Sequence, residues 1–75
     1  MEEKVKEIIA RVLQVPVEEV ENETEIGELD EWESLRNLTI FVEIQKEFNI
    51  EITQDMLMDI ENVDDIINLV KNLAK

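Results

Sequence analysis

The sequence predicts an all-α fold, a four-helix bundle with a long first loop and a short third helix. Three stretches of the chain have the apolar spacing of a helix, and in two of them the apolar residues form a single face. One run, at residues 48–52, alternates with a period of two, and no second alternating run exists with which it could pair as a strand. We expect a single domain over residues 1–75, near the lower size limit for a core without disulfides or metal.

The first helix is predicted at residues 3–14, where apolar residues recur at intervals of three and four. These apolar residues are Val5, Ile8, Ile9, Val12 and Leu13. Charged residues occupy the opposite face. Pro16 disfavours the helical conformation of Val15, so the helix should end there.

A long acidic loop is predicted from Pro16 to Glu33. Five apolar residues are spread through it, namely Val17, Val20, Ile26, Leu29 and Trp32. A long loop that carries so many apolar side chains is expected to pack over the core, and Trp32 is expected to be a core plug. From Asn22 onward, Gly27 and Glu33 fall where an EF-hand has its glycine and its last ligand, but Ile26 takes a ligand position. We therefore expect no metal site.

The central helix is predicted at residues 34–48, the most apolar stretch of the chain. Its apolar residues are Leu35, Leu38, Ile40, Phe41, Val42, Ile44 and Phe48. At about 100° per residue they spread over roughly 220° of the circumference, about twice the stripe that a surface helix needs. We expect this helix to be covered on more than one side and to be followed by an extended connection at residues 48–52.

Two further helices are predicted near the C-terminus. Thr53 is expected to cap a short helix at residues 54–58, and Asn62 is expected to cap the last helix. The last helix has a single apolar face formed by Val63, Ile66, Ile67, Val70 and Leu73. Asp64 and Asp65 would lie in its first turn, where the helix dipole favours negative charge.

The net charge restricts the class of partner. Twenty acidic residues against seven basic ones give a net charge of −13. Nucleic acid and anionic membranes are poor partners for such a surface, whereas basic patches on proteins are favourable ones. The N-terminus lacks the features of a secretory signal and no apolar run reaches transmembrane length, so we expect a cytoplasmic monomer with no membrane partner.

Ser34 is the candidate functional residue, because it follows an acidic segment and begins the apolar helical stretch. The chain has no histidine and no cysteine, so Ser34 cannot belong to a Ser-His-Asp or Cys-His site. No pair of carboxylates stands out as a general acid and base, and we expect no enzymatic activity. Two interpretations of Ser34 stay open: an N-cap of the helix, or a site that another enzyme modifies.

Five segments of the chain follow the pattern of one known family. They are Ile8-Ile9, the turn at residues 13–20, Glu33-Ser34-Leu35, the run at residues 47–52, and the helix start at residues 62–65. With these segments the chain resembles the acyl carrier protein family over essentially its whole length. The resemblance implies that Ser34 carries a 4'-phosphopantetheine arm, attached from coenzyme A by a phosphopantetheinyl transferase. The reactive thiol then belongs to the arm, which accounts for the absence of cysteine.

The chain departs from the family pattern around the serine. Glu33 stands where the family usually has aspartate, and the longer side chain makes a poorer N-cap. Fatty-acid carriers usually place acidic residues on the following helix, where this chain has Arg36, Asn37, Thr39, Gln45 and Lys46. The string Trp32-Glu33-Ser34-Leu35 resembles a form seen in some stand-alone carriers of specialised pathways. The resemblance thus implies partners other than the usual fatty-acid enzymes.

The resemblance also implies a group of binding residues. The candidates for contact with basic docking patches of acyl-loading and acyl-transferring enzymes are Glu28, Asp30, Glu31, Glu33, Leu35, Arg36 and Thr39. The wide apolar arc of the central helix also predicts a cleft for a short apolar chain. Its candidate lining residues, each with ordinary core as the alternative role, are Phe41, Ile44, Met56, Leu57 and Ile60. The function implied is that of an acyl carrier of a specialised lipid or secondary-metabolite pathway. The alternatives are an aminoacyl or peptidyl carrier and an unmodified acidic protein-binding domain of the same fold.

Overall fold

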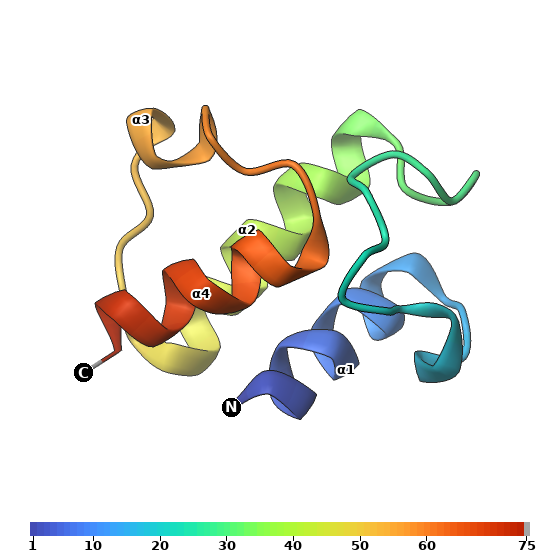
Figure 1. Ribbon diagram of the computed structural model, residues 1–75, viewed down its shortest axis with the longest axis horizontal. Coiled ribbons are helices and arrows are strands. Elements are labelled where there is room, and N and C mark those ends of the chain that lie inside the picture. Colours follow the sequence, from blue (N-terminus) through green and yellow to red (C-terminus); the bar gives the residue numbers. More distant parts are fainter. Residues whose placement is uncertain (75) are drawn as a thin grey trace.

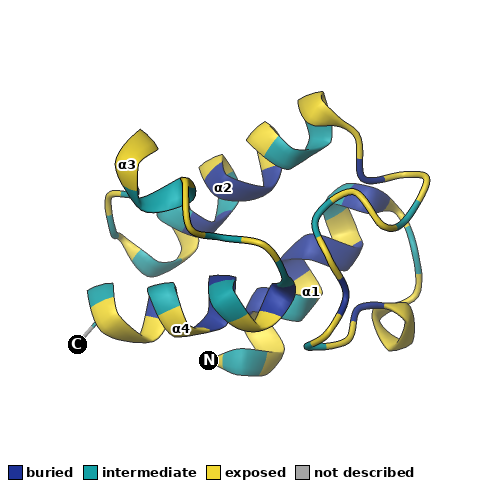
Figure 2. Ribbon diagram, turned by 45° about the horizontal axis from the view of Figure 1, so that its top comes forward, coloured by how far each residue is buried: buried dark blue, intermediate teal, exposed yellow. Residues whose placement is uncertain are grey.

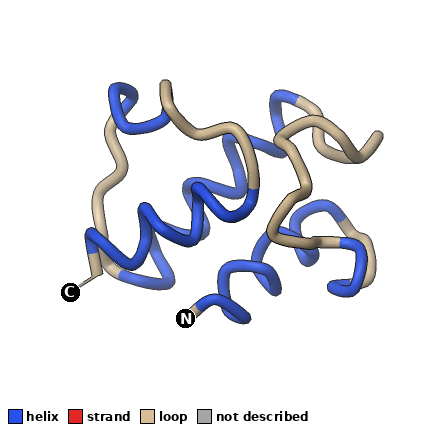
Figure 3. Tube along the Cα trace, viewed as in Figure 1, coloured by secondary structure: helices blue, strands red, loops and turns tan. Residues whose placement is uncertain are grey.

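The computed structural model describes residues 1–74. The helices are α1 (Glu2–Leu13), the 3-10 helix η1 (Val17–Glu19), α2 (Ser34–Phe48), α3 (Gln54–Leu57) and α4 (Val63–Leu73). Within residues 1–74 there is no strand, and one isolated bridge joins Glu25 to Asn62, so the all-α prediction is confirmed (Figure 3). Helix α1 contacts both α2 and α4, while the long first loop and α3 lie at opposite ends of the molecule (Figure 1). Among residues 1–74, none of the helices has the length and apolar character of a membrane span.

Helix α1 begins and ends one residue before its predicted bounds. It ends because Gln14 adopts the left-handed conformation, with φ of 61°, and donates its backbone N–H to the carbonyl of Ala10. The apolar face is buried as predicted, apart from Val12, which is half-buried. A side chain in the left-handed region is strained, and glycine is the usual residue at this position of a helix end.

We expect Gln14→Gly to stabilise the protein by about 0.5–1 kcal/mol, because relief of the left-handed strain exceeds the entropy that glycine adds to the unfolded chain. At this size that corresponds to a rise of a few degrees in the melting temperature, measured by circular dichroism. The matched control is Gln54→Gly, at the start of α3, which removes the same side chain from a residue of ordinary helical geometry and should lower the melting temperature. An unchanged or lower value for Gln14→Gly would contradict the prediction.

The long loop packs over the core, as predicted for most of its apolar residues. Val20 and Trp32 are buried, and Ile26 and Leu29 pack against the core. The prediction was wrong for Val17, which is 42% exposed on η1, a turn that the sequence pattern does not reveal.

The middle of this loop is hydrogen-bonded to the start of α4. The backbone N–H of Ile26 donates to Glu61 O at 2.9 Å, and the N–H groups of Val63 and Asp64 donate to Thr24 O and Asn22 O, each at 2.9 Å. The first N–H groups of a helix have no partner within the helix. The loop therefore supplies acceptors for two N–H groups of the first turn of α4.

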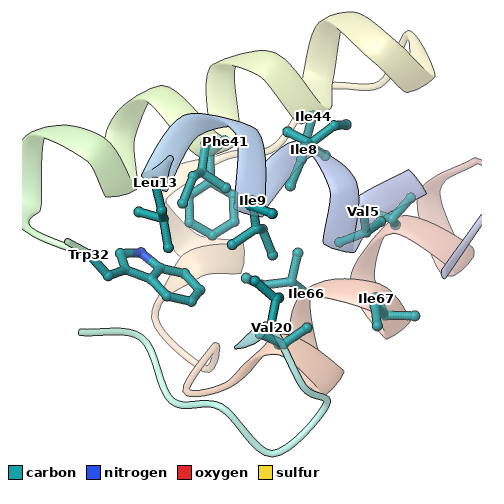
Figure 4. Packing of buried hydrophobic residues seen from close by; sticks show 14 residues of the cluster. Val5, Ile8, Ile9, Leu13, Val20, Trp32, Phe41, Ile44, Ile66 and Ile67 are labelled. Carbon is teal, nitrogen blue, oxygen red and sulfur yellow. The ribbon is translucent and has the colours of Figure 1, made fainter. Parts of the chain in front are cut away.

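The core is formed by side chains of α1, the long loop, α2 and α4 (Figure 4). Its buried apolar residues are Val5, Ile8, Ile9, Ala10, Leu13, Val20, Trp32, Ile40, Phe41, Ile44, Val63, Ile66, Ile67 and Val70. Helix α3 contributes no fully buried residue, and Leu57 packs against the edge of the core.

Helix α2 has the predicted bounds, but the expectation that it is covered on more than one side was wrong. Only Ile40, Phe41 and Ile44 are buried on it. Leu35, Leu38 and Val42 are 69%, 63% and 41% exposed. These three residues follow one another at intervals of three and four and form the α2 apolar stripe. The apolar arc of α2 is wider than the surface that α1 and the core can cover, and its outer face is exposed (Figure 2).

The predicted caps after α2 have different outcomes. Asn49 ends α2 in the left-handed conformation, and residues 50–53 form a connection without regular structure. Thr53 occupies the N-cap position of α3, which is one residue shorter than predicted, but its side chain makes no capping hydrogen bond. Asn62 caps α4 as predicted, with its side chain accepting a hydrogen bond from the N–H of Asp65 at 2.9 Å.

Candidate functional site

Ser34 is the first residue of α2, and its side chain is exposed. The N-cap position belongs to Glu33, whose backbone is extended, so the interpretation of Ser34 as the cap was wrong. The Glu33 side chain makes no capping hydrogen bond, which agrees with its expected weakness as a cap. Within residues 1–74 the Ser34 hydroxyl has no hydrogen-bond partner. It is therefore free to be modified.

The helix start around Ser34 favours an anionic group. The first hydrogen bond of α2 runs from the N–H of Asn37 to Glu33 O at 2.9 Å. The N–H groups of residues 34–36 lie before this bond and have no intrahelical acceptor. The dipole of a 15-residue helix adds a partial positive charge at this end. A phosphate ester on Ser34 would lie where N–H groups and the helix dipole stabilise negative charge.

Trp32 fixes the chain just before Ser34. It is 3% exposed and packs in the core near Leu13 and Ile9, so the prediction of a core plug is confirmed (Figure 4). Its indole Nε1–H donates to Asn37 Oδ1 at 2.9 Å, and its backbone N–H donates to Leu29 O at 2.9 Å. The Trp32–Asn37 bond spans Ser34, so the residues on both sides of the serine are held in place.

Arg36 is turned inward. Its guanidinium Nη1 donates to the carbonyl of Leu13 at 3.0 Å, and the residue is half-buried. Leu13 is the last residue of α1, where the carbonyl groups are unpaired and the helix dipole favours a cation. Arg36 thereby ties the start of α2 to the end of α1. The prediction of Arg36 as a partner contact did not include this bond, because no sequence pattern indicates which distant carbonyl a guanidinium will reach.

Four other polar residues of α2 also make contacts within the molecule. Asn37 accepts from Trp32, and Thr39 donates its hydroxyl to Leu35 O at 3.1 Å. Gln45 donates to Phe41 O at 3.2 Å and accepts from the N–H of Ile52 at 2.8 Å. Lys46 Nζ lies 3.8 Å from Glu43, which also pairs with Arg11 of α1. Asn37 and Gln45 thus hold neighbouring segments in place, whereas Thr39 bonds within its own helix and Lys46 forms an exposed ion pair.

The acidic candidates lie directly before the serine. Glu28, Asp30, Glu31 and Glu33 are all exposed. One of them, Glu28, also accepts a hydrogen bond from the N–H of Glu25 at 3.0 Å. The exposed surface next to Ser34 therefore has carboxylates on the loop side and the α2 apolar stripe on the helix side.

The structure separates the acyl-pocket candidates. Phe41 and Ile44 are 4% and 0% exposed within the core, and Leu57 packs against it. Met56 and Ile60 line a surface hollow of about 370 Å³ between the α3 region and α4. The other residues that line it are Asp59, Asp65, Asn68, Leu69 and Asn72. Two of the five candidates therefore share one hollow.

The comparisons with known proteins fit this site. A family model described as a phosphopantetheine attachment site matches residues 3–70. The chain belongs to this family. The carrier fold is also that of a solved structure, the solution NMR structure of the holo acyl carrier protein from Geobacter metallireducens. The TM-score is 0.86 at 22% sequence identity, with 96% of this chain and 83% of that chain covered.

The cofactor of this carrier is covalent 4'-phosphopantetheine, and the residues around Ser34 fit it. The hydroxyl is exposed and unpaired, and the helix start offers free N–H groups to a phosphate. When attached, the arm supplies a thiol that can hold a cargo as a thioester. No group of three or more acidic, histidine or cysteine side chains suited to a metal ion occurs within residues 1–74.

Proposed function

We propose that this carrier holds an acyl group as a thioester on a 4'-phosphopantetheine arm attached to Ser34 and delivers it to partner enzymes. The observation that supports the proposal is the exposed, unpaired hydroxyl of Ser34 at the start of α2, in a chain whose family model describes phosphopantetheine attachment. The carrier acts as a monomer in the cytoplasm and catalyses no reaction itself. Its pathway is a specialised lipid or secondary-metabolite pathway.

Attachment of the arm needs only one nucleophile from this chain. The Ser34 oxygen attacks the phosphate of coenzyme A that bears the pantetheine, a new P–O bond forms, and the bond to the departing 3',5'-ADP breaks. The hydroxyl proton passes to a base of the transferase, because the carrier has no histidine. The protein positions the hydroxyl and stabilises the phosphodiester charge at the start of α2.

Intact mass spectrometry tests the proposal. After incubation with coenzyme A and a broad-specificity phosphopantetheinyl transferase, the wild-type chain should gain the mass of one phosphopantetheine. A known carrier in the same reaction shows that the transferase is active. If the wild-type chain gains no mass while the control converts fully, the carrier proposal is contradicted. The remaining alternative is then an unmodified acidic domain that binds other proteins.

The partner surface that we infer extends from the loop acids to the α2 apolar stripe. Glu28, Asp30, Glu31 and Glu33 offer negative charge to basic docking patches on the loop side of Ser34. Leu35 and Thr39 are exposed on the helix side. Arg36 is half-buried and its guanidinium donates to Leu13 O, so we do not include it among the charges that partners contact. Partner enzymes of this carrier therefore contact few carboxylates on α2 itself.

We expect the modified carrier to be a poor substrate for ordinary fatty-acid synthases that bind an acidic α2 through arginine and lysine. Thr39→Glu should raise kcat/KM with such a synthase by a factor of about 1.4 to 5, since one exposed charge pair is worth about 0.2–1 kcal/mol. Thr39 is suited to this test because it is exposed and its own bond is a local one to Leu35 O.

The matched control for this prediction is Gln54→Glu, which adds the same charge on α3 and should leave kcat/KM unchanged. Equal gains in the two variants would indicate a general charge effect. A wild-type kcat/KM equal to that of a standard fatty-acid carrier would contradict the specialised pathway and indicate a role in general fatty-acid synthesis.

A further inference from the structure

The start of α2 lacks the side-chain cap that usually fixes the end of a helix. Glu33 occupies the N-cap position, but its side chain makes no capping hydrogen bond. The first intrahelical bond joins Asn37 N to Glu33 O at 2.9 Å. Helix ends without further support fray. Ser34 is the first residue of this helix, so the position of its hydroxyl depends on contacts that hold the first turn from outside.

A hydrogen bond joins the residues on either side of this turn. Trp32 Nε1–H donates to Asn37 Oδ1 at 2.9 Å, and Trp32 is 3% exposed, so the donor is fixed in the core (Figure 4). Trp32 directly precedes the N-cap, and Asn37 is the fourth residue of the helix. In many helices apolar side chains at these two positions pack together as a hydrophobic staple, which fixes the angle at which the chain enters the helix. Here a hydrogen bond joins the same two positions, and we call it the Trp32–Asn37 staple.

The staple leaves the first N–H groups of α2 free. A side-chain cap accepts a hydrogen bond from the N–H of the second or third helical residue, which here are Leu35 and Arg36. The staple instead uses the indole N–H of Trp32 and the side-chain oxygen of Asn37. The turn is therefore fixed without occupying the N–H groups that a phosphate on Ser34 would contact.

Arg36 ties the same turn to a second segment. Its guanidinium Nη1 donates at 3.0 Å to the carbonyl of Leu13, the last residue of α1. A chain without the staple still has this attachment between α2 and α1. We therefore expect such a variant to fold and to lose order only around the first turn of α2.

We propose that Trp32 and Asn37 are positioning residues for phosphopantetheine attachment, because their bond holds the Ser34 oxygen in the orientation in which it attacks the phosphate of coenzyme A. The proposal rests on the carrier function above. Neither side chain takes part in the covalent step. A displacement of about 1 Å at a reacting atom can cost about 100-fold in rate, and the staple limits that displacement at a helix start that has no cap.

The kinetics of attachment separate positioning from docking. Single-turnover reactions with excess transferase give a rate constant at saturation and the transferase concentration at half saturation. Asn37→Leu keeps the size of the side chain and removes the acceptor. It should lower the rate constant about three- to tenfold, because Ser34 is then misplaced for part of the time. The half-saturation concentration should not change, since the loop acids remain. An unchanged rate constant would overturn the proposal.

Two further substitutions serve as controls. Asn37→Asp keeps an oxygen that can accept from the indole, so its rate constant should be close to that of the wild type. Asn72→Leu makes the same change as Asn37→Leu at an exposed residue of α4 and should leave both kinetic quantities at their wild-type values. A rate constant as low in Asn37→Asp as in Asn37→Leu would show that the acceptor is not what matters and would overturn the staple.

Substitution of the donor tests the bond from its other side and provides a reading if Asn37→Leu fails to fold. Trp32→Phe keeps a ring in the core and removes Nε1, so it should lower the rate constant by a similar factor. Because both substitutions remove the same bond, the double variant should be about as slow as the slower single variant. Reductions that multiply in the double variant would indicate two independent effects and would overturn the staple.

NMR of the unmodified chain measures the order of the turn without the transferase. The chain has one tryptophan, so a single indole N–H signal reports the bond. In Asn37→Leu this signal should shift, and backbone order parameters at residues 33–36 should fall from about 0.85 toward about 0.6, while those of Ile8 and Ile44 stay high. Order parameters that do not fall would overturn the staple.

The two measurements together distinguish the possible failures. If the turn loses order in Asn37→Leu while the attachment rate is unchanged, the positioning role alone is contradicted. If the wild type gains no phosphopantetheine, the proposed function is contradicted and the positioning role with it.

Discussion

Ser34→Ala should abolish attachment of phosphopantetheine. The substitution removes the only atom of this site that can form the phosphodiester, and no histidine or cysteine exists in the chain to replace it as a nucleophile. Because the Ser34 side chain is exposed and makes no hydrogen bond within the described part of the chain, the variant should fold normally. Intact mass after reaction with coenzyme A and the transferase should therefore show one adduct on the wild type and none on Ser34→Ala.

Thr39→Ala is the matched control for this experiment. Thr39 is a second exposed hydroxyl on α2, and its loss should leave the adduct in place. The melting temperatures of Ser34→Ala and the wild type should differ by no more than the shift that corresponds to about 0.5 kcal/mol of unfolding free energy. Such agreement would show that the fold is intact. An adduct that persists on Ser34→Ala would place the attachment site at another residue.

Trp32→Ala should produce the largest loss of stability among single substitutions near the site. Removing a buried aromatic side chain costs about 3–5 kcal/mol, and a domain of this size has only about 5–15 kcal/mol in total. Trp32 is 3% exposed, and its indole bond to Asn37 is lost as well. We expect the melting temperature to fall by more than about 10 °C, measured by circular dichroism.

Two variants separate the contributions of Trp32. Trp32→Phe keeps a ring in the core and removes the indole donor, so it should cost less than Trp32→Ala, with about 1 kcal/mol due to the hydrogen bond. Leu35→Ala removes an apolar side chain that is 69% exposed and should change stability by less than about 0.5 kcal/mol. Similar melting temperatures for Trp32→Ala and Leu35→Ala would contradict the role of Trp32 as a core plug.

Local sequence signals were sufficient for most of the fold. The face of α1, the Asn62 cap and the bounds of α2 follow from side-chain spacing and from capping chemistry, which act within a few residues. The prediction that Ser34 carries the arm came from the resemblance to a family, since a serine at a helix start is by itself compatible with a cap.

The features that the sequence did not reveal depend on distant parts of the chain. Arg36 bonds to the carbonyl of a residue 23 positions earlier, and Gln45 bonds to an N–H beyond the end of its own helix. Composition cannot tell whether a polar side chain on a helix faces a partner or a neighbouring segment. The burial of α2 was overestimated for the same reason. Side-chain periodicity gives the width of the apolar arc of a helix, but it does not give the width of the neighbouring segments that cover the arc.

The bond between Trp32 and Asn37 has a consequence for how cargo is delivered. Because this bond spans Ser34, we expect the proposed attachment point to be fixed to the core, so that the arm alone supplies the freedom of the cargo. For a tethered group, the effective concentration at a target site depends on the length and stiffness of the tether. A loop that swung at Ser34 would lengthen the tether and dilute the cargo over a larger volume. The buried indole keeps the search volume as small as the arm permits.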